Sequence, residues 1–404
     1  MRGILAPSDL PFATDGSVVS VGGRARWVGQ EAPVLHLYDA LGAVVTDIGG
    51  DVPEASLVVA QGKLERADGG HTLRGARVVR AFAQPRATNP RDTLRFAESG
   101  VARLLELRQA ATAIVRAYFA EQRFLEVTTP VLVPSPGLDL HLGAFGVLTP
   151  AGERFLSTSP EYQMKRLLVG GVPRCFQLAP CFRRDESGRH HNAEFTMLEW
   201  YRGFAEVDDV IADTEALVGA VVDGLGTAQT PALDWSRPFE RITVTKAFQD
   251  HAGVEESAML EMARTDPETF FRYLVDRVEP ALAARRRPVV LERYPREMAS
   301  LARLCPDDDR YAERFEVYAA SLELCNGFGE LCDPAEQRLR FERDQRERAD
   351  LGLPVYPIDE RFLEALAGGM PPAAGNALGF DRLVMLAAGQ PEIDRVIAFP
   401  TGEL

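Results

Sequence analysis

One stretch near the middle of the chain combines the residue types that bind phosphate with those that bind amines. Residues 181–202 read CFRRDESGRHHNAEFTMLEWYR. The second half alternates, which predicts a strand with one aromatic and acidic face. That face comprises Phe195, Met197, Glu199 and Tyr201. The centre, DESGRHH, is turn-like, so we expect two antiparallel strands joined by a charged loop. An ordinary hairpin is the alternative, but an unpaired carboxylate such as Glu199 among apolar side chains costs several kcal/mol, which favours a functional site.

The flanking segments predict the elements that position this stretch. Apolar residues at helical spacing predict a helix over 101–124 that runs into a strand, FLEVTTPVLV. A second helix is expected over 204–225, and residues 241–310 are expected to be mostly helical. The segment GNALGFDRLVMLAAG predicts a strand entering a helix whose first turn contains Arg382.

The N-terminal part has a different pattern. From Ser17 to Phe82, short β-rich runs alternate with Gly, Asp and Pro turns, which predicts a small barrel of the OB type, with a flat sandwich as the alternative. The segment AQPRATNPRD is typical of a linker. We therefore expect an OB-like β-barrel domain over 1–88 and a catalytic domain over 89–404.

Composition narrows the class of protein. The 404 residues include 59 acidic and 45 basic residues, a formal net charge of −14. The overall charge therefore does not attract nucleic acid, although it does not exclude a local basic patch. No stretch approaches the roughly 20 apolar residues of a membrane span, so we expect a soluble cytoplasmic enzyme. The chain has no P-loop and no glycine-rich dinucleotide fingerprint, so a nucleotide needs another kind of site.

Three scattered segments resemble such a site, that of the class II aminoacyl-tRNA synthetases. FLEVTTPVL, the stretch 181–202 and GNALGFDRLVML resemble motifs 1, 2 and 3 in order and spacing. SPEYQMKRLLVGG, RFEVYAASLELCNGFGEL and ALGFDRLVML resemble the lysyl branch, and within it most closely the elongation factor P lysine ligases. The resemblance covers roughly residues 100–400. It implies an α+β fold in which helices flank an antiparallel sheet.

The resemblance implies an ATP site with two catalytic arginines. Arg183 would hold the α-phosphate and Arg382 the far end of the triphosphate, because a planar guanidinium suits an oxyanion. His191 would lie over the phosphates, and Phe195 would stack beneath the purine. Asp185 stands where the family usually has glutamate, and its shorter arm is expected to shift the contact with ATP.

Glu316 and Glu323 are the expected metal ligands. Like charges held close are unfavourable unless a cation lies between them, and the resemblance implies Mg²⁺ bridging phosphate oxygens. A hairpin turning at Ala319-Ala320 would set the two carboxylates directly opposite, whereas a helix through RFEVYAASLEL would also align them. Helical spacing fits the apolar residues, so the hairpin rests on the resemblance. A solvated acidic face is the remaining alternative.

A lysine site needs acid at both ends of an aliphatic stem and an apolar or aromatic wall between them. By resemblance, Glu161 and Glu199 face the amino group near the reacting carboxylate, although Glu161 also fits an ordinary carboxylate at a helix start. The tail of the substrate would be lined by Tyr201, Asn326, Phe328 and Glu330. Ala377 stands where the synthetases usually have glycine and the ligases alanine, which favours the ligases and a β-amino acid.

The sequence thus predicts a ligase that uses ATP and Mg²⁺ to activate lysine or (R)-β-lysine and to transfer it to a lysine side chain of elongation factor P. The alternative is a lysyl-tRNA synthetase, which the N-terminal barrel favours because the ligases generally lack one. Trp27 and Tyr38 are the barrel residues that would stack on RNA, and both also fit a barrel core. A paralogue without catalysis is a third hypothesis, against which the intact site residues argue. The resemblance also implies a homodimer formed through the helix at 101–122 and Pro130.

Overall fold

The computed structural model describes residues 3–67, 70–82, 91–140, 142–226 and 233–404. Internal contacts divide the chain into two compact units, Met1–Glu106 and Leu107–Leu404. The domain boundary predicted at residues 88 and 89 lies outside the described residues and stays a prediction.

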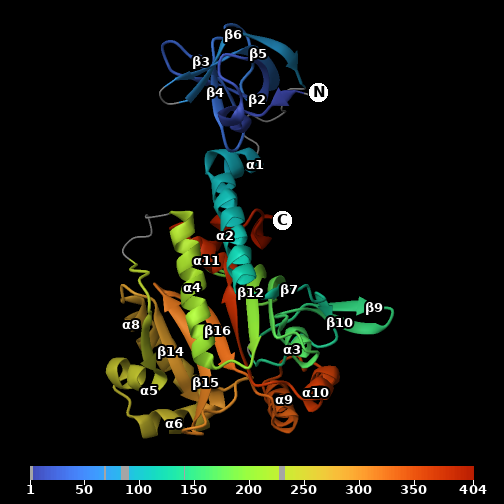
Figure 1. Ribbon diagram of the computed structural model, residues 1–404, viewed down its shortest axis with the longest axis vertical. Helices are drawn as coiled ribbons and strands as arrows, with labels where there is room; N and C mark the ends of the chain where they lie inside the picture. The colour runs from blue at the N-terminus through green and yellow to red at the C-terminus, as the bar shows by residue number, and fades with distance from the viewer. Residues whose placement is uncertain (1–2, 68–69, 83–90, 141, 227–232) are drawn as a thin grey trace. The chain divides into compact units, whose positions relative to one another are not determined.

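The first unit contains a closed five-stranded barrel (Figure 1). Its strands are β2 (Val18–Val28), β3 (Val34–Tyr38), β4 (Ala43–Thr46), β5 (Leu57–Ala67) and β6 (Gly70–Ala81). They pair in the order β2-β3-β4-β6-β5, and β5 pairs back with β2 to close the barrel. The short strand β1 (Ile4–Leu5) adds to β2, and a 3-10 turn, Pro7–Phe12, follows it. Leu37, Val58 and Leu73 belong to the buried core. The OB-like barrel is confirmed.

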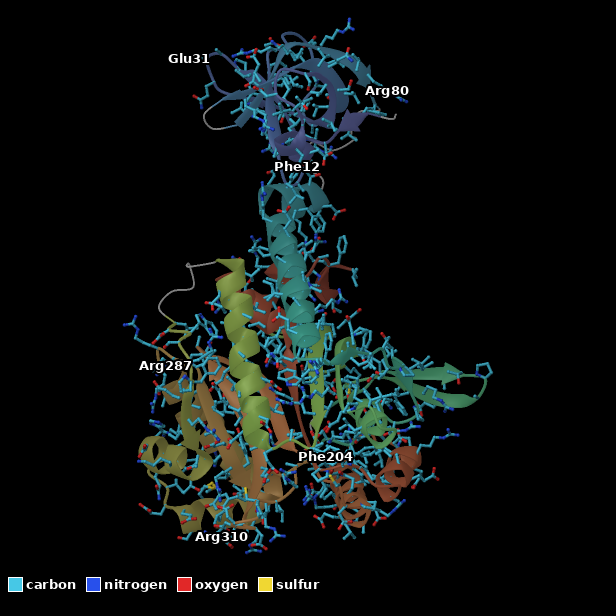
Figure 2. The ribbon with its side chains drawn as sticks, in the orientation of Figure 1. Phe12, Glu31, Arg80, Phe204, Arg287 and Arg310 are labelled. Atoms are coloured by element: carbon cyan, nitrogen blue, oxygen red, sulfur yellow. The ribbon has the colours of Figure 1, made fainter. Side chains whose placement is uncertain are left out.

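Charged side chains such as Glu31 and Arg80 project from the outer surface of this barrel (Figure 2). The Arg80 guanidinium lies 4.7 Å from the centre of the Phe82 ring. The indole nitrogen of Trp27 donates to the main-chain oxygen of Val52 at 2.7 Å, and the ring packs against the barrel core. The barrel's own packing therefore accounts for Trp27.

The second unit is built on an eight-stranded sheet of order β13-β14-β15-β16-β17-β12-β11-β7. Its strands are β7 (Leu125–Glu126), β11 (Arg174–Phe182), β12 (Glu194–Gly203), β13 (Glu240–Thr243), β14 (Val289–Pro295), β15 (Tyr311–Ala319), β16 (Leu322–Gly329) and β17 (Ala373–Gly379). Neighbouring strands run antiparallel except for the edge pairs β13–β14 and β7–β11. A smaller sheet contains β8 (Leu132–Val133), β9 (Gly146–Thr149) and β10 (Gly152–Leu156). The predicted α+β architecture is confirmed.

Helices cover both faces of the large sheet. On one face, α2 (Val101–Glu121), α4 (Val207–Leu225) and α11 (Phe380–Ala387) share a buried core with Leu198 and Trp200 of β12 (Figure 1). The other face packs against α3 (Glu161–Val169), α9 (Pro334–Asp350) and α10 (Glu360–Ala367). The alternation of β12 therefore sends Leu198 and Trp200 to one core and places Glu199 and Tyr201 on the opposite face. Among the helices of the described residues, none has the length and apolar composition that crossing a bilayer needs.

Residues 241–310 are mostly helical, as expected. The helix over 244–252 includes α5 (Val244–Ala247), α6 spans Glu256–Thr265, and the helix over 267–283 includes α7 (Pro267–Tyr273) and α8 (Glu279–Ala283). The segment also contains most of β13 and all of β14, which were not expected. The run Val289–Leu291 is fully buried between β13 and β15. A short apolar run of this kind looks the same in a buried strand and in a buried helix, which explains why β14 was not predicted.

Candidate active site

A single row of residues crosses the face of the large sheet that carries Glu199. Glu316 pairs with Asn326, Asn326 with Ala377, Ala377 with Glu199, and Glu199 with Gln177. Directly opposed residues in antiparallel strands project from the same face. Five strands from distant parts of the chain therefore bring predicted metal-binding and substrate-binding positions into one line.

The next row carries the predicted wall of the substrate tail. Phe328 and Tyr201 both pair with Gly375 of β17. A Cβ atom at position 375 would lie 2.2 Å from the Tyr201 ring and 2.8 Å from a carboxylate oxygen of Glu330. Only glycine therefore lets these two side chains approach each other over β17.

Glu199 is fully buried among polar partners. Its carboxylate accepts a hydrogen bond from the Ser159 hydroxyl at 2.6 Å and one from the Tyr201 hydroxyl at 2.9 Å. Burial, followed by the charge of Glu161, raises the pKa of Glu199 to about 8. A cation placed beside Glu199 would stabilise its ionised form, and this suits an ammonium ligand.

Glu161 and Glu330 are joined by a residue to which the sequence analysis gave no role. Glu161 begins α3, and Lys165 lies one turn later. The Lys165 ammonium, fully buried, forms ion pairs of 2.5 Å with Glu161 and with Glu330. Burial raises the pKa of Glu330 to about 7, although Lys165 acts in the opposite direction. The four-residue spacing of Glu161 and Lys165 was the available signal, but the contact with Glu330 is tertiary.

Arg183 follows the end of β11, at the start of the loop that leads to β12. Its guanidinium donates to Glu186 at 3.0 Å and lies 5.1 Å from the centre of the Phe195 ring. Its Nε is buried and has no partner among the described residues. An unpaired buried donor on a planar cation fits an oxyanion such as a phosphate oxygen. Stacking of Phe195 on a purine stays a prediction, since Arg183 lies over this ring.

Asp185 and Glu186 lie in different surroundings. Asp185 is exposed, and its carboxylate pairs with the adjacent Arg184 at 3.1 Å. Glu186, one residue later, makes the ion pair with Arg183. A role for Asp185 in ATP binding therefore stays a prediction, and Glu186 is a residue that the sequence analysis missed.

Arg382 lies in the first turn of α11 and reaches back to the motif 2 loop. It donates to the main-chain oxygen of Glu323 at 2.8 Å and contacts the imidazole of His191. Burial and the charge of Arg382 lower the pKa of His191, and Arg183 adds a smaller effect in the same direction. The charges of both predicted catalytic arginines therefore lower the pKa of the same histidine.

The hairpin interpretation of RFEVYAASLEL is correct, and the helix is wrong. Strands β15 and β16 pair from Arg314 and Phe328 to Ala319 and Leu322, and Ala320 turns with a φ of 52°. The register differs from expectation, because the chain turns at residues 320–321, so that Ala319 pairs with Leu322 and Glu323 pairs with Tyr318 instead of Glu316.

This register nevertheless puts the two carboxylates on the same face of the sheet. Tyr318 and Glu316 are two residues apart on β15, so Glu323 and Glu316 project from the same face. Burial and the charge of Glu316 raise the pKa of Glu323 to about 7. The Glu316 carboxylate is held by Arg314 and by the Tyr318 hydroxyl, each at 2.6 Å. A divalent cation between the carboxylates would relieve their repulsion, so the residues present fit a hard metal ion.

Comparison with known sequences agrees with this geometry. The family model of class II tRNA synthetases (D, K and N) matches residues 88–403. The chain belongs to this family.

Among the curated relatives of this class II chain are three proteins named elongation factor P--(R)-β-lysine ligase. The protein of Haemophilus influenzae (strain ATCC 51907 / DSM 11121 / KW20 / Rd) is 41% identical over 312 residues, which is 72% of this chain and 93% of the relative. That of Erwinia tasmaniensis is 42% identical over 315 residues, covering 74% and 95%. That of Proteus mirabilis is 40% identical over 316 residues, covering 75% and 96%.

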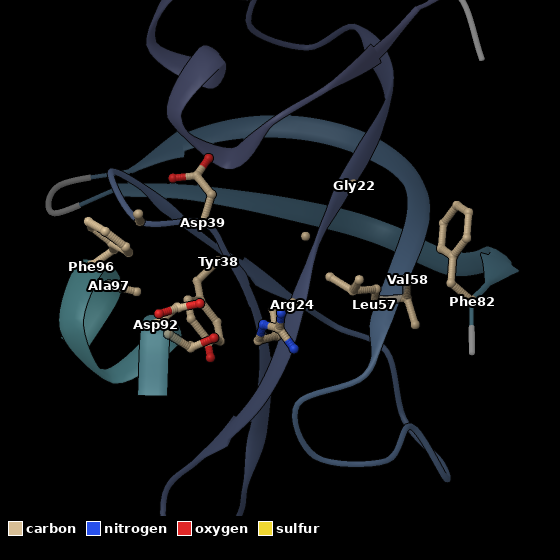
Figure 3. Close-up of a pocket in the computed structure, with 13 residues that line it drawn as sticks. Gly22, Arg24, Tyr38, Asp39, Leu57, Val58, Phe82, Asp92, Phe96 and Ala97 are labelled. Atoms are coloured by element: carbon tan, nitrogen blue, oxygen red, sulfur yellow. The ribbon is translucent and has the colours of Figure 1, made fainter. Parts of the chain in front are cut away.

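The class II family model starts at residue 88, so most of the barrel unit lies outside it. This unit has a groove of about 550 Å³, whose lining includes Gly22, Arg24, Tyr38, Leu57 and Phe96 (Figure 3). The Arg26 guanidinium lies 4.4 Å from the centre of the Tyr38 ring. Tyr38 therefore lies at the barrel surface, whereas the Trp27 side chain packs against the barrel core.

Proposed function

We propose that this protein is an ATP-dependent ligase that activates lysine or (R)-β-lysine as an adenylate and transfers it to a lysine side chain of elongation factor P. The observation that carries the proposal is that two buried carboxylates lie near Tyr201: Glu199 accepts a hydrogen bond from its hydroxyl, and Glu330 approaches its ring over Gly375. Acid at both ends of an aromatic wall matches a substrate with two ammonium groups. The names of the relatives support the same substrate and acceptor.

In the first step, a carboxylate oxygen of the amino acid attacks the α-phosphorus of ATP in line. The bond from this phosphorus to the bridging oxygen breaks, and pyrophosphate leaves. Arg183 donates to the α-phosphate while negative charge grows on its oxygens, and Arg382 holds the leaving end. One well-placed donor of this kind contributes about 3 to 4 kcal/mol in other enzymes. The step needs no protein nucleophile.

Glu316 and Glu323 would hold Mg²⁺. The described residues contain no cluster of three or more metal-binding side chains, so phosphate oxygens and water would complete the shell, as is usual for this ion. When bound, the ion neutralises charge on the phosphates.

In the second step, the uncharged ε-amine of the acceptor lysine attacks the carbonyl carbon of the adenylate. The bond between this carbon and the phosphate oxygen breaks, AMP leaves, and the amine gives up a proton as the amide forms. The acceptor has to enter as the free base, because an ammonium has no lone pair. Activity therefore depends on how the acceptor lysine is deprotonated.

The barrel favours a second candidate, a lysyl-tRNA synthetase that esterifies the terminal ribose hydroxyl of tRNA. To separate the two, purified protein is given ATP, Mg²⁺ and labelled α-lysine or (R)-β-lysine, and is offered elongation factor P and bulk tRNA in separate reactions. We expect label on elongation factor P. Acylation of tRNA alone would assign the synthetase function instead. We also propose that the protein is a homodimer formed through motif 1, which light scattering tests.

A further inference from the structure

We propose that Lys165 is an internal counter-ion of the substrate pocket, which positions Glu161 and Glu330 and matches the charge of the pocket to a substrate with two ammonium groups. This inference rests on the proposed function and assigns a role to a residue that the proposed function does not use. Lys165 does not touch the reacting atoms in this account, so it is a positioning residue.

The geometry makes Lys165 a bridge between two separate parts of the fold. Glu161 belongs to the first turn of α3, whereas Glu330 follows β16. The ammonium of Lys165 lies 2.5 Å from a carboxylate oxygen of each residue, and neither Lys165 nor Glu330 has more than 1% of its side chain exposed. A buried ammonium is stable only with close anionic partners. Lys165 therefore fixes both carboxylates relative to each other.

The net charge of the pocket can be compared with the charge of the substrate. The pocket contains three carboxylates, those of Glu161, Glu199 and Glu330, and one ammonium, that of Lys165. With all four ionised, the pocket carries two negative charges. An activated diamino acid, whose own carboxylate is joined to AMP in a mixed anhydride, carries two ammonium groups and neutralises them. Without Lys165 a third negative charge would have no compensating cation, which favours protonation of one of the carboxylates.

Loss of Lys165 would change the protonation of Glu330 most. Besides Lys165, the charged and titratable groups acting on Glu330 are Glu161, Tyr201, Arg303 and Cys332. Lys165 is the cation in contact with Glu330, whereas Arg303 pairs with Glu206 and Glu313. Removal of the ammonium thus leaves a buried carboxylate that is protonated at neutral pH and no longer attracts the substrate. Raising the pH would restore the charge.

The test is the Lys165→Met variant in the full chain, assayed by lysine-dependent exchange of pyrophosphate into ATP. We expect the KM for lysine to rise by about tenfold or more near neutral pH, since about 1.4 kcal/mol corresponds to one factor of ten. The KM for ATP should not change, and the defect should shrink as the pH rises. Lys246→Met is the matched control, because Lys246 also pairs with a carboxylate four residues away, Asp250, but is exposed.

Two results would overturn the inference. One is a folded Lys165→Met variant with an unchanged KM for lysine. The other is an equal rise of both KM values with no recovery at high pH, which indicates a structural role alone. If Lys165→Met does not fold, the double variant Lys165→Met with Glu330→Gln removes both charges of the buried pair. It should keep a raised KM for lysine and lose the recovery at high pH, and an unchanged KM would again overturn the inference.

The exchange assay of the wild-type enzyme distinguishes failure of this inference from failure of the proposed function. Absence of exchange with both lysine and β-lysine in the wild type contradicts the proposed function. Normal exchange in the wild type with no selective effect of Lys165→Met contradicts only the role of Lys165.

Discussion

Asp381 accepts a hydrogen bond from the main-chain nitrogen of Thr196 at 2.7 Å, which fastens motif 3 to motif 2. The same carboxylate pairs with Arg108 of α2, and Arg108 donates to the Thr196 hydroxyl at 2.8 Å. Arg382 follows Asp381 directly, and Phe195 precedes Thr196. The buried carboxylate therefore sets the distance between the two halves of the proposed ATP site.

Asp381→Ala should destabilise the catalytic unit. Its side chain is 3% exposed, and removing one partner of a buried ion pair costs about 3 to 5 kcal/mol. Urea unfolding followed by circular dichroism measures the loss. Glu261→Ala is the control, because Glu261 and its partner Arg264 are both well exposed, and it should change stability little. Equal stability of the two variants would contradict the account.

Arg183→Ala should reduce the rate of pyrophosphate exchange about 100- to 1000-fold, as expected for loss of one preorganised donor to a growing oxyanion. The neighbouring Arg184 pairs with Asp185 at the surface, so Arg184→Ala should exchange at the wild-type rate. Steady-state exchange assays of both variants decide the matter. Retained exchange in Arg183→Ala would remove this residue from the proposed chemistry.

Glu199 should make lysine binding dependent on pH. Its pKa is raised to about 8 by burial and by Glu161, so the protonated form predominates below this value. The affinity for lysine should increase as the pH rises toward about 8, because the substrate ammonium needs the carboxylate. The free energy of unfolding of the protein without substrate changes with pH in the opposite direction. A folded-state pKa above the unfolded value means that the protein without substrate loses stability as the pH rises through about 8.

Glu199→Gln is the matching variant for this pH dependence. It keeps the shape of the side chain and cannot ionise. Calorimetric titration with lysine across this pH range should give a weak and nearly constant affinity. A dependence on pH like that of the wild type would assign the titration to another group.

Glu323→Gln should raise the Mg²⁺ concentration that gives half-maximal exchange. Removing one charge from a metal site or its surroundings commonly costs about 10- to 100-fold in metal affinity. Titration with Mg²⁺ at saturating ATP provides the measurement, and Glu364→Gln on the exposed face of α10 is the control. An unchanged Mg²⁺ requirement would place the ion elsewhere.

Local patterns were sufficient to predict most elements of the fold. The helix expected over 204–225 is α4, where Glu206 and Asp209 form a capping box and Gly226 ends the helix with a φ of 60°. The strand and helix expected around Arg382 are β17 and α11. Capping and alternation are properties of neighbouring residues, so one sequence reveals them.

Tertiary features could not be predicted in this way. The turn at residues 320–321, which pairs Glu323 with Tyr318, is one residue later than expected, and nothing in RFEVYAASLEL indicates this shift. Lys165 could be seen beside Glu161, but not beside Glu330, which is distant in the sequence. The ion pair between Glu186 and Arg183 depends on the course of the loop after β11.

We propose that this site activates an amino acid with two ammonium groups. The most direct test is pyrophosphate exchange by the purified wild-type protein with α-lysine, (R)-β-lysine and norleucine, which has the same chain as lysine without the terminal amine. The account predicts exchange with lysine or β-lysine and none with norleucine. Exchange with norleucine at a rate like that of lysine, or no exchange with any of the three, would contradict it.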